Sequence, residues 1–304
     1  MNAEAVLIAG PTASGKSTAA LVLAEALNGI VVNADSMQVY REVAVLSARP
    51  SAADTTRAPH LLYGHVSATE RYSVGRYQTD AIAALAEARA RKRLPIFVGG
   101  TGLYFAALTD GLSEIPSVPA DIRARARERL DVLGVAGLHA ELAARDPATA
   151  AQLRATDPQR VLRAWEVFEA TGRPLSSWQG EAGKPVLKGL RLARFVLDVP
   201  RPILRERIAV RFQAMLGAGA RAEAAALAGL DPTLPAAKIL GLRELRALDQ
   251  GAMTQEDAVT AAVTATRQFA KRQITWFRHR MADWDWIEVD DFGNFVSHMR
   301  QKLS

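Results

Sequence analysis

Cysteine is absent from the 304-residue chain, and no apolar run reaches the length that a membrane-spanning helix needs. The first absence excludes disulfides and thiolate metal sites and fits a reducing compartment. The opening residues MNAEAVLIAG have no basic region before their apolar run, so we interpret them as a first strand and not as a signal peptide. These absences predict a cytoplasmic protein that makes no membrane contact.

Negative charge is in short supply relative to positive charge. Lys and Arg number 38 against 32 Asp and Glu, which gives a net charge of +6. Such an excess suits a polyanionic partner, and it suits equally well an arginine-rich composition that serves no partner. Hydrophobic residues make up 49% of the chain, as in an ordinary soluble globular protein.

Apolar runs and helical patterns alternate along the first part of the chain. Strands are predicted at Ala5–Gly10, in the segment GIVVNADS and at Leu94–Gly102, with helices at Ser17–Leu27 and Thr79–Arg93. This alternation predicts a parallel sheet with helices on its faces, and ligands of such sheets gather at the carboxyl ends of the strands.

The pattern becomes helical near Ser113. Asp-Pro pairs at Asp146 and Asp157 are expected to begin two helices, because Asp is a good N-cap and Pro fits the first turn. A strand at Gly189–Pro200 then returns the chain to the sheet, helices continue to about Arg280, and the last residues hold a possible strand and a terminal helix. The predicted fold class is α/β, with a P-loop catalytic core at 1–114 and 189–304 and an all-helical insertion at 115–188.

The segment from Gly10 to Ser17 fits the G-x4-GK[ST] phosphate-binding pattern, and it lies between a predicted strand and a predicted helix. Backbone N–H groups can surround an anion there, and the helix N-terminus adds partial positive charge. Lys16 supplies a cation and Ser17 a possible Mg²⁺ ligand. The residues expected to bind a diphosphate are Gly10, Pro11, Thr12, Ala13, Ser14, Gly15, Lys16 and Ser17. Two enzyme classes fit: an ATP-dependent kinase of a small molecule or nucleotide, and an enzyme that holds a departing diphosphate.

The segment NADSMQVYR ends the second predicted strand. A carboxylate such as Asp35, beside the loop, can be a magnesium ligand or a general base, and it can equally be a simple turn or cap residue. Ser36 and Gln38 are side chains suited to reading the edges of bases.

Six segments extend these patterns beyond a generic phosphate loop: GPTASGKS, NADSMQVYR, YSVGRYQTDA, VGGTGLYFAAL, DPQRVLRAWEV and TRQFAKRQITWFR. Together they closely resemble the bacterial tRNA dimethylallyltransferases, also called tRNA isopentenyltransferases, over nearly the whole chain. The resemblance implies transfer of a dimethylallyl group from dimethylallyl diphosphate to N6 of adenosine 37, beside the tRNA anticodon, with Mg²⁺ as cofactor. In that family the loop holds the diphosphate of the donor, so no phosphoryl group moves.

The resemblance also implies roles for individual residues. Asp35 would be the general base on the adenine amine, and Thr101 would act at the tRNA side of the site. Lys16 and Ser17, with Mg²⁺, would neutralise the departing diphosphate, and Arg211 matches an arginine that reaches it. The residues that match tRNA-contacting positions are Asp35, Ser36, Met37, Gln38, Thr101, Gln159, Arg160, Arg163, Lys238, Arg243, Lys271, Arg272, Gln273, Trp276 and Arg278. The chain departs from the family pattern at Val45–Pro50, Pro59–Leu62 and Leu240–Arg243.

Two basic segments bear on the RNA partner. In ADIRARARERL, four arginines fall within two turns and form either a solvated helix face or, through Arg123 and its neighbours, a grip on phosphates of the anticodon stem-loop. In RQFAKRQITWFRHR, the charges are expected to contact RNA and the aromatic residues to lie mainly in the core. The expected protein is a monomer. An RNA-binding P-loop protein whose nucleotide only regulates binding remains the non-enzymatic alternative.

Overall fold

A computed structural model describes residues 3–181, 183–289, 297, 299, 301 and 302. It divides into two compact units, one made of residues 1–109 and 186–304 and the other of residues 110–185. The division lies a few residues before the positions 115 and 188 that the change of sequence pattern suggests. Each unit has a hydrophobic core of its own.

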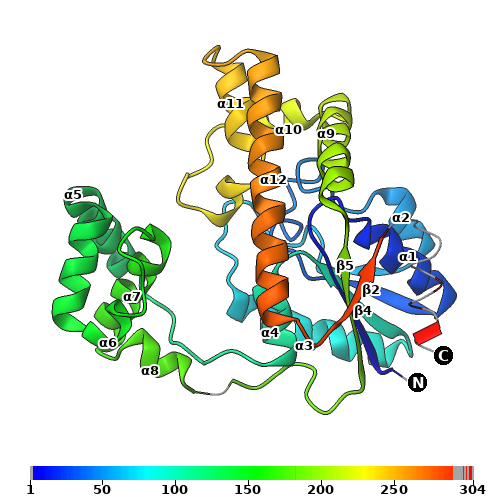
Figure 1. The fold of residues 1–304 in the computed structure, drawn as a ribbon, viewed down its shortest axis with the longest axis horizontal. Helices are drawn as coiled ribbons and strands as arrows, with labels where there is room; N and C mark the ends of the chain where they lie inside the picture. Colours follow the sequence, from blue (N-terminus) through cyan, green and yellow to red (C-terminus); the bar gives the residue numbers. More distant parts are fainter. Residues whose placement is uncertain (1–2, 182, 290–296, 298, 300, 303–304) are drawn as a thin grey trace. The chain divides into compact units, whose positions relative to one another are not determined.

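Within the described residues, the first unit is built on a six-stranded sheet of order β3-β2-β4-β1-β5-β6 (Figure 1). All neighbouring strands are parallel. The strands are β1 (Ala5–Ala9), β2 (Gly29–Asn33), β3 (His60–Leu61), β4 (Leu94–Gly99), β5 (Leu192–Asp198) and β6 (Asp285–Glu288). This sheet confirms the predicted α/β class.

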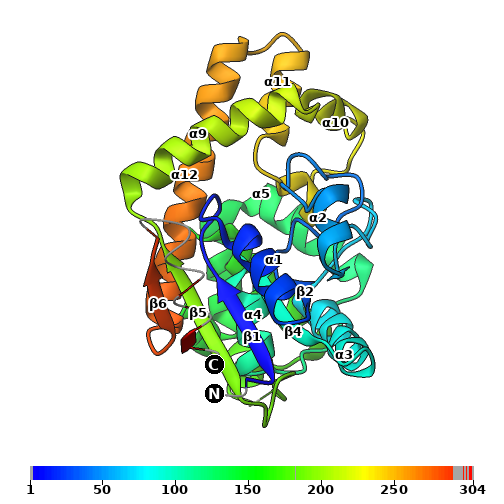
Figure 2. The same ribbon diagram turned by 90° about the vertical axis from the view of Figure 1, so that its right-hand side faces the viewer.

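Helices cover both faces of the sheet. Because successive side chains of a strand point to opposite faces, alternate residues of each central strand enter different cores. In β1, Val6 and Ile8 belong to the core that contains α1, whereas Leu7 and Ala9 belong to the core that contains residues of α3 and α4. Figure 2 shows α1 in front of β1 and α4 behind it. The helices of this unit are α1 (Lys16–Ala26), α2 (Ala52–Arg57), α3 (Val74–Ala90), α4 (Gly102–Thr109), α9 (Arg201–Gly217), α10 (Ala220–Ala226), the 3₁₀ turn η1 (Pro235–Lys238), α11 (Leu242–Asp249) and α12 (Gln255–Arg280).

Two helices differ from the sequence prediction. Helix α3 begins at Val74 and not at Thr79, because the Ser73 side chain caps it by accepting a hydrogen bond from the Arg76 amide at 3.2 Å. Helix α4 begins at Gly102, where the third predicted strand ends, and no helix is predicted from the sequence over this segment. Five of its eight residues are buried, and the exposed Leu103 is also apolar, so the segment carries no amphipathic signal. The predicted terminal helix falls largely on residues outside the described part of the chain.

The second unit is helical, with α5 (Ala120–Arg145), α6 (Pro147–Ala150), α7 (Pro158–Thr171) and α8 (Leu175–Gln179). Both predicted Asp-Pro caps are confirmed: Asp146 accepts from the Thr149 amide at 3.0 Å, and Asp157 accepts from the Arg160 amide at 3.1 Å. Helix α5 is kinked at Gly134, whose φ of 64° lies in the left-handed region that glycine tolerates. The core of the second unit contains Leu138 and Leu142 of α5 and Trp165 of α7.

Candidate functional site

The phosphate loop joins β1 to α1 at the carboxyl edge of the sheet, where Ala9 is in register with Gly99 of β4. Ala13 and Gly15 have φ angles of 65° and 88°, which turn the backbone around the loop. Helix α1 has no acidic residue in its first turn and no side-chain cap, so its first N–H groups face an uncovered position. The loop therefore has the geometry of an anion site.

Three charged side chains converge on this loop: Lys16, Arg211 and Asp35. Lys16 donates from Nζ to the Pro11 carbonyl at 3.1 Å, and Arg211 of α9 donates to the Thr12 hydroxyl. Burial lowers the pKa of Lys16 to about 8, while the negative charge of Asp35 raises it and the positive charge of Arg211 lowers it further. Burial also lowers the pKa of Arg211, while the negative charge of Asp35 raises it. An anion bound in the loop would restore the balance of charge, since two of the three groups are cations.

Asp35 is held in place by Asn33, a buried residue at the end of β2. The Asn33 side chain accepts from the Asp35 amide at 2.8 Å and donates to the Asp35 carbonyl at 2.9 Å and the Leu62 carbonyl at 3.0 Å. Oδ1 of Asp35 accepts from the Met37 amide at 2.9 Å. Among the described residues Oδ2 has no hydrogen-bond partner, so it is the oxygen able to accept a proton. The positioning role of Asn33 was missed; an Asn two residues before an Asp at a strand end is its only signal in the sequence.

The turn after β4 is interlocked with Asp35 and Ser36. A Cβ at Gly99 would lie 2.0 Å from the Ala34 carbonyl oxygen, so only glycine permits this approach of β2 and β4. Thr101 accepts from the Ser36 amide at 2.9 Å and donates to the Ser36 hydroxyl at 3.2 Å. Asp35, Ser36 and Thr101 are thus brought together beside the loop.

Gln273 of α12 joins the phosphate loop to this turn. Its Oε1 accepts from the Thr12 amide at 2.9 Å, and its Nε2 donates to the Gly100 carbonyl at 2.8 Å. The side chain is 6% exposed. The resemblance placed Gln273 among tRNA contacts; in this structure the amide is buried and bonded within the protein, so it holds two parts of the site together.

Gln38 differs from its expected role in a similar way. It is 8% exposed, and Nε2 donates to the Ser47 carbonyl at 3.0 Å and the Ala48 carbonyl at 2.9 Å. Its donors are therefore occupied by the loop that follows, where the chain departs from the family pattern. Ser36 and Met37, by contrast, are partly exposed.

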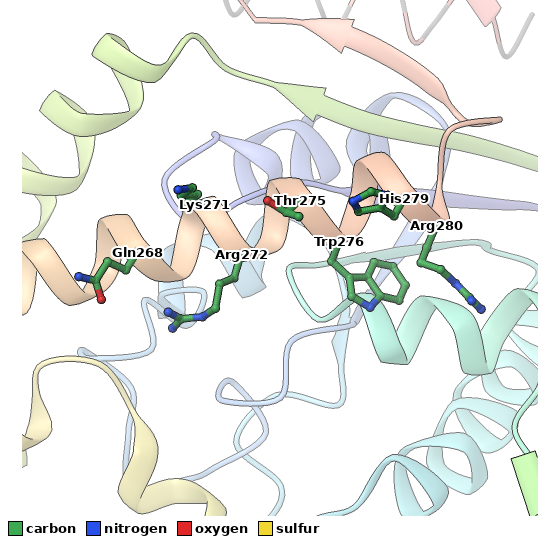
Figure 3. Close-up of a pocket in the computed structure, with 7 residues that line it drawn as sticks. All are labelled: Gln268, Lys271, Arg272, Thr275, Trp276, His279 and Arg280. Carbon is green, nitrogen blue, oxygen red and sulfur yellow. The ribbon is translucent and has the colours of Figure 1, made fainter. Parts of the chain in front are cut away.

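A second group of expected RNA contacts lies on α12. A pocket of about 500 Å³ is lined by Gln268, Lys271, Arg272, Thr275, Trp276, His279 and Arg280. Figure 3 shows Arg272 and Trp276 on one side of the helix and Lys271 on the other. The Trp276 ring packs against Gly102, where a Cβ would come within 2.2 Å of it. Phe277 is instead buried in the core, so the aromatic residues of this segment divide between core and pocket.

The other expected contacts of the first unit are exposed. Lys238 ends η1, Arg243 lies in the first turn of α11 beside Glu244, and Arg278 approaches Asp198 to 3.9 Å. Nothing in their geometry brings them to the phosphate loop.

The remaining candidates belong to the helical unit. Arg123 lies on α5, and Gln159, Arg160 and Arg163 lie on α7. Burial lowers the pKa of Arg163, Glu166 raises it, and the nearby Arg123 lowers it, so the two arginines form one cationic patch. The basic helix is otherwise partly neutralised: Arg125 pairs with Glu169 at 2.9 Å, and Arg129 pairs with Glu141.

Metal ligands from the protein are few. Among the described residues, no three His, Cys, Asp or Glu side chains are grouped to hold a metal ion. The Ser17 hydroxyl is exposed at the start of α1 and has no hydrogen-bond partner in the described part of the chain. No described helix combines the length and apolar character needed to cross a bilayer.

Comparisons with known proteins agree with one another. The family model IPP transferase matches residues 38–280, and the model isopentenyl transferase matches residues 3–63. A tRNA dimethylallyltransferase of Azorhizobium caulinodans is 52% identical over 92% of this chain and 90% of its own length. One of a Bradyrhizobium species is 51% identical over 94% of each chain.

Solved structures are similar over almost the whole chain. A tRNA isopentenylpyrophosphate transferase of Bacillus halodurans has a TM-score of 0.69 and 31% identity, and the match covers 98% of this chain and 94% of that one. A eukaryotic dimethylallyltransferase acting on tRNA has a TM-score of 0.78 and 26% identity, with 98% and 77% covered.

Proposed function

The chain belongs to the IPP transferase family, and from this premise we propose that it transfers a dimethylallyl group from dimethylallyl diphosphate to N6 of adenosine 37 in tRNA, releasing diphosphate. One observation supports the site of this reaction above the others. The open oxygen of Asp35 lies beside a phosphate loop that contains Lys16 and that Arg211 of α9 contacts through Thr12. A proton acceptor and a diphosphate site are thus adjacent.

The phosphate loop serves the leaving group. The first N–H groups of α1, the Lys16 ammonium and the Arg211 guanidinium surround the position of the diphosphate. As the bond from the allylic carbon to oxygen breaks, both electrons go to the diphosphate, and these donors stabilise the charge that develops. Because they stand in place before the reaction, little reorganisation is needed at that step.

Asp35 serves the nucleophile. The N6 amine of adenine is conjugated with the ring and becomes acidic as it is alkylated. Oδ2 of Asp35 takes the N6 proton while nitrogen bonds to the allylic carbon. The Met37 N–H donates to Oδ1 of Asp35, and the Asn33 side chain accepts from the Asp35 backbone N–H. These two hydrogen bonds fix the carboxylate for that transfer. Thr101 positions the turn through Ser36.

The residues present fit a magnesium ion that arrives with the substrate. Mg²⁺ commonly takes one or two protein ligands together with substrate phosphate oxygens, and the exposed Ser17 hydroxyl is placed to be such a ligand. When bound, the ion would neutralise diphosphate charge.

For tRNA binding we retain Arg123, Gln159, Arg160 and Arg163 on the helical unit, and a set on the first unit. That set is Ser36, Met37, Lys238, Arg243, Lys271, Arg272, Trp276 and Arg278. Adenosine 37 must leave its stack to reach Asp35, at a cost of a few kcal/mol. A monomeric, cytoplasmic enzyme acting on the anticodon stem-loop completes the proposal.

The test uses unmodified tRNA, Mg²⁺ and either dimethylallyl diphosphate or ATP. We expect tRNA to gain the mass of one prenyl unit with the first donor only. A phosphorylated product formed with ATP, and no change with dimethylallyl diphosphate, would show a kinase instead.

A further inference from the structure

Helices α9 and α12 of the first unit pack together and border a groove of about 380 Å³. Figure 2 shows the two helices crossing side by side. Five cationic side chains line the groove: Arg201 and Arg205 from α9, and Arg267, Lys271 and Arg278 from α12. Apolar residues of both helices, among them Ile208 and Ile274, lie between them. The groove is therefore lined by both cationic and apolar side chains.

Within the described part of the chain, no carboxylate lines this groove. Arg201, Arg205, Arg267 and Lys271 form no ion pair or hydrogen bond with any described residue, and Arg278 reaches Asp198 only at 3.9 Å. Many arginines elsewhere in the chain are paired, for example Arg57 with Glu25 at 2.8 Å and Arg76 with Glu70 at 2.9 Å. Five like charges in one groove repel one another, so an anionic ligand would be bound with a favourable change in electrostatic energy.

The arrangement suits a chain of phosphates better than a single small anion. Arg267 and Arg278 are separated by eleven residues of one helix, which corresponds to about 16 Å at the helical rise per residue. The cations are thus spread along the groove, whereas a diphosphate already has Lys16, Arg211 and the α1 amides. Thr264, Gln268 and Thr275 add neutral hydrogen-bonding groups along the same line.

We propose that the α9–α12 groove binds consecutive backbone phosphates of the RNA substrate, with Arg201, Arg205 and Arg267 as contacts not implied by the family motifs. The proposal rests on the proposed function, because it takes tRNA as the substrate. Phosphate contacts of this kind orient the RNA and supply affinity without reading sequence. The groove would therefore strengthen binding of every tRNA substrate to a similar degree.

The experiment compares two double variants. Arg201→Gln with Arg205→Gln removes two charges from the groove. The control, Arg89→Gln with Arg207→Gln, removes two charges from α3 and from a position of α9 that does not line it. Binding of unmodified tRNA is measured by fluorescence anisotropy without donor, over a series of salt concentrations. Arg267→Gln provides an independent groove variant on α12.

In the groove variant we expect roughly three- to tenfold weaker binding at low salt. The slope of log affinity against log salt should decrease by about two, or by about one for Arg267→Gln. The KM for dimethylallyl diphosphate should stay unchanged. The control should lose little affinity and keep its slope.

Three outcomes would overturn the proposal. Equal losses in groove and control variants would mean that only net charge matters. Unchanged tRNA binding in every variant would show that RNA does not occupy the groove. A raised KM for the donor with unaltered tRNA affinity would assign the groove to the diphosphate. If instead wild-type protein bound tRNA through the groove but transferred no prenyl group, the proposed function would fail and the groove would stand.

Discussion

Gln273 offers the sharpest test of how the site is held together. Its replacement by leucine leaves the Thr12 N–H and the Gly100 carbonyl without their partners, in a position that is 6% exposed. Each buried polar group left without a hydrogen bond costs about 1–3 kcal/mol, partly offset by the apolar side chain. We expect Gln273→Leu to lower the free energy of unfolding by about 2–4 kcal/mol.

The catalytic effect should exceed what instability alone causes. Gln273 bridges the loop that binds the leaving group and the turn beside the proton acceptor, and misplacement of reacting groups by about 1 Å can cost a hundredfold in rate. We therefore expect kcat to fall by roughly a hundredfold, with tRNA affinity unchanged. Gln273→Glu keeps an acceptor for the Thr12 amide but adds negative charge near the diphosphate, so it should raise the KM for the donor.

The assay measures kcat, the KM of each substrate, tRNA affinity and thermal unfolding for both variants. Gln255→Leu is the matched control, because Gln255 is exposed at the start of the same helix. If Gln273→Leu kept the wild-type kcat and lost only tRNA affinity, Gln273 would be a tRNA contact, and the bridging role would be refuted.

Three further predictions follow from the site. Asp35→Asn should lower kcat at least a hundredfold with tRNA affinity unchanged in a binding assay; lost tRNA binding would contradict the assignment as base. Raising the pH through about 8 deprotonates Lys16 in the free enzyme and should raise the KM for the donor, whereas Lys16→Arg should show no such rise. The pKa of Lys16 in the folded protein lies below its ordinary value of 10.5, so between about pH 8 and 10.5 the folded state binds fewer protons than the unfolded state. The contribution of Lys16 to the free energy of unfolding should therefore increase with pH in this range. Arg123→Ala should weaken tRNA binding and reduce the slope of log affinity against log salt by about one. Arg125→Ala should change the affinity and the slope less, because Arg125 is already paired with Glu169.

Much of the fold was predictable, because its signals are local. Short apolar strands such as Ala5–Ala9, the glycine pattern of the loop and the Asp146 and Asp157 caps all act within a few residues. Helix α4 was not predictable from periodicity, since its exposed Leu103 is as apolar as its buried residues and the helix has no polar face.

The structure places Asp35, Ser36 and Thr101 beside the phosphate loop, as the motifs suggest, but several contacts of the predicted residues were not foreseeable. Gln273 lies 261 residues from Thr12, so no spacing rule connects them, and the family resemblance implied an RNA contact instead. Asn33 and Gln38 show the same limit: both are polar residues near Asp35, and only the fold shows that their side chains are used within the protein. The groove between α9 and α12 likewise depends on packing between helices distant in sequence.

The central claim is that carbon moves to tRNA while the diphosphate stays with the phosphate loop and is released. It is tested most directly with a donor labelled with isotopic carbon in the dimethylallyl group and radioactive phosphorus in the diphosphate. The account predicts that the carbon label appears on N6 of adenosine 37 and that the phosphorus label is recovered as free diphosphate in equal amount. Phosphorus label in the tRNA, or carbon label left in the unreacted donor while tRNA is bound, would contradict it.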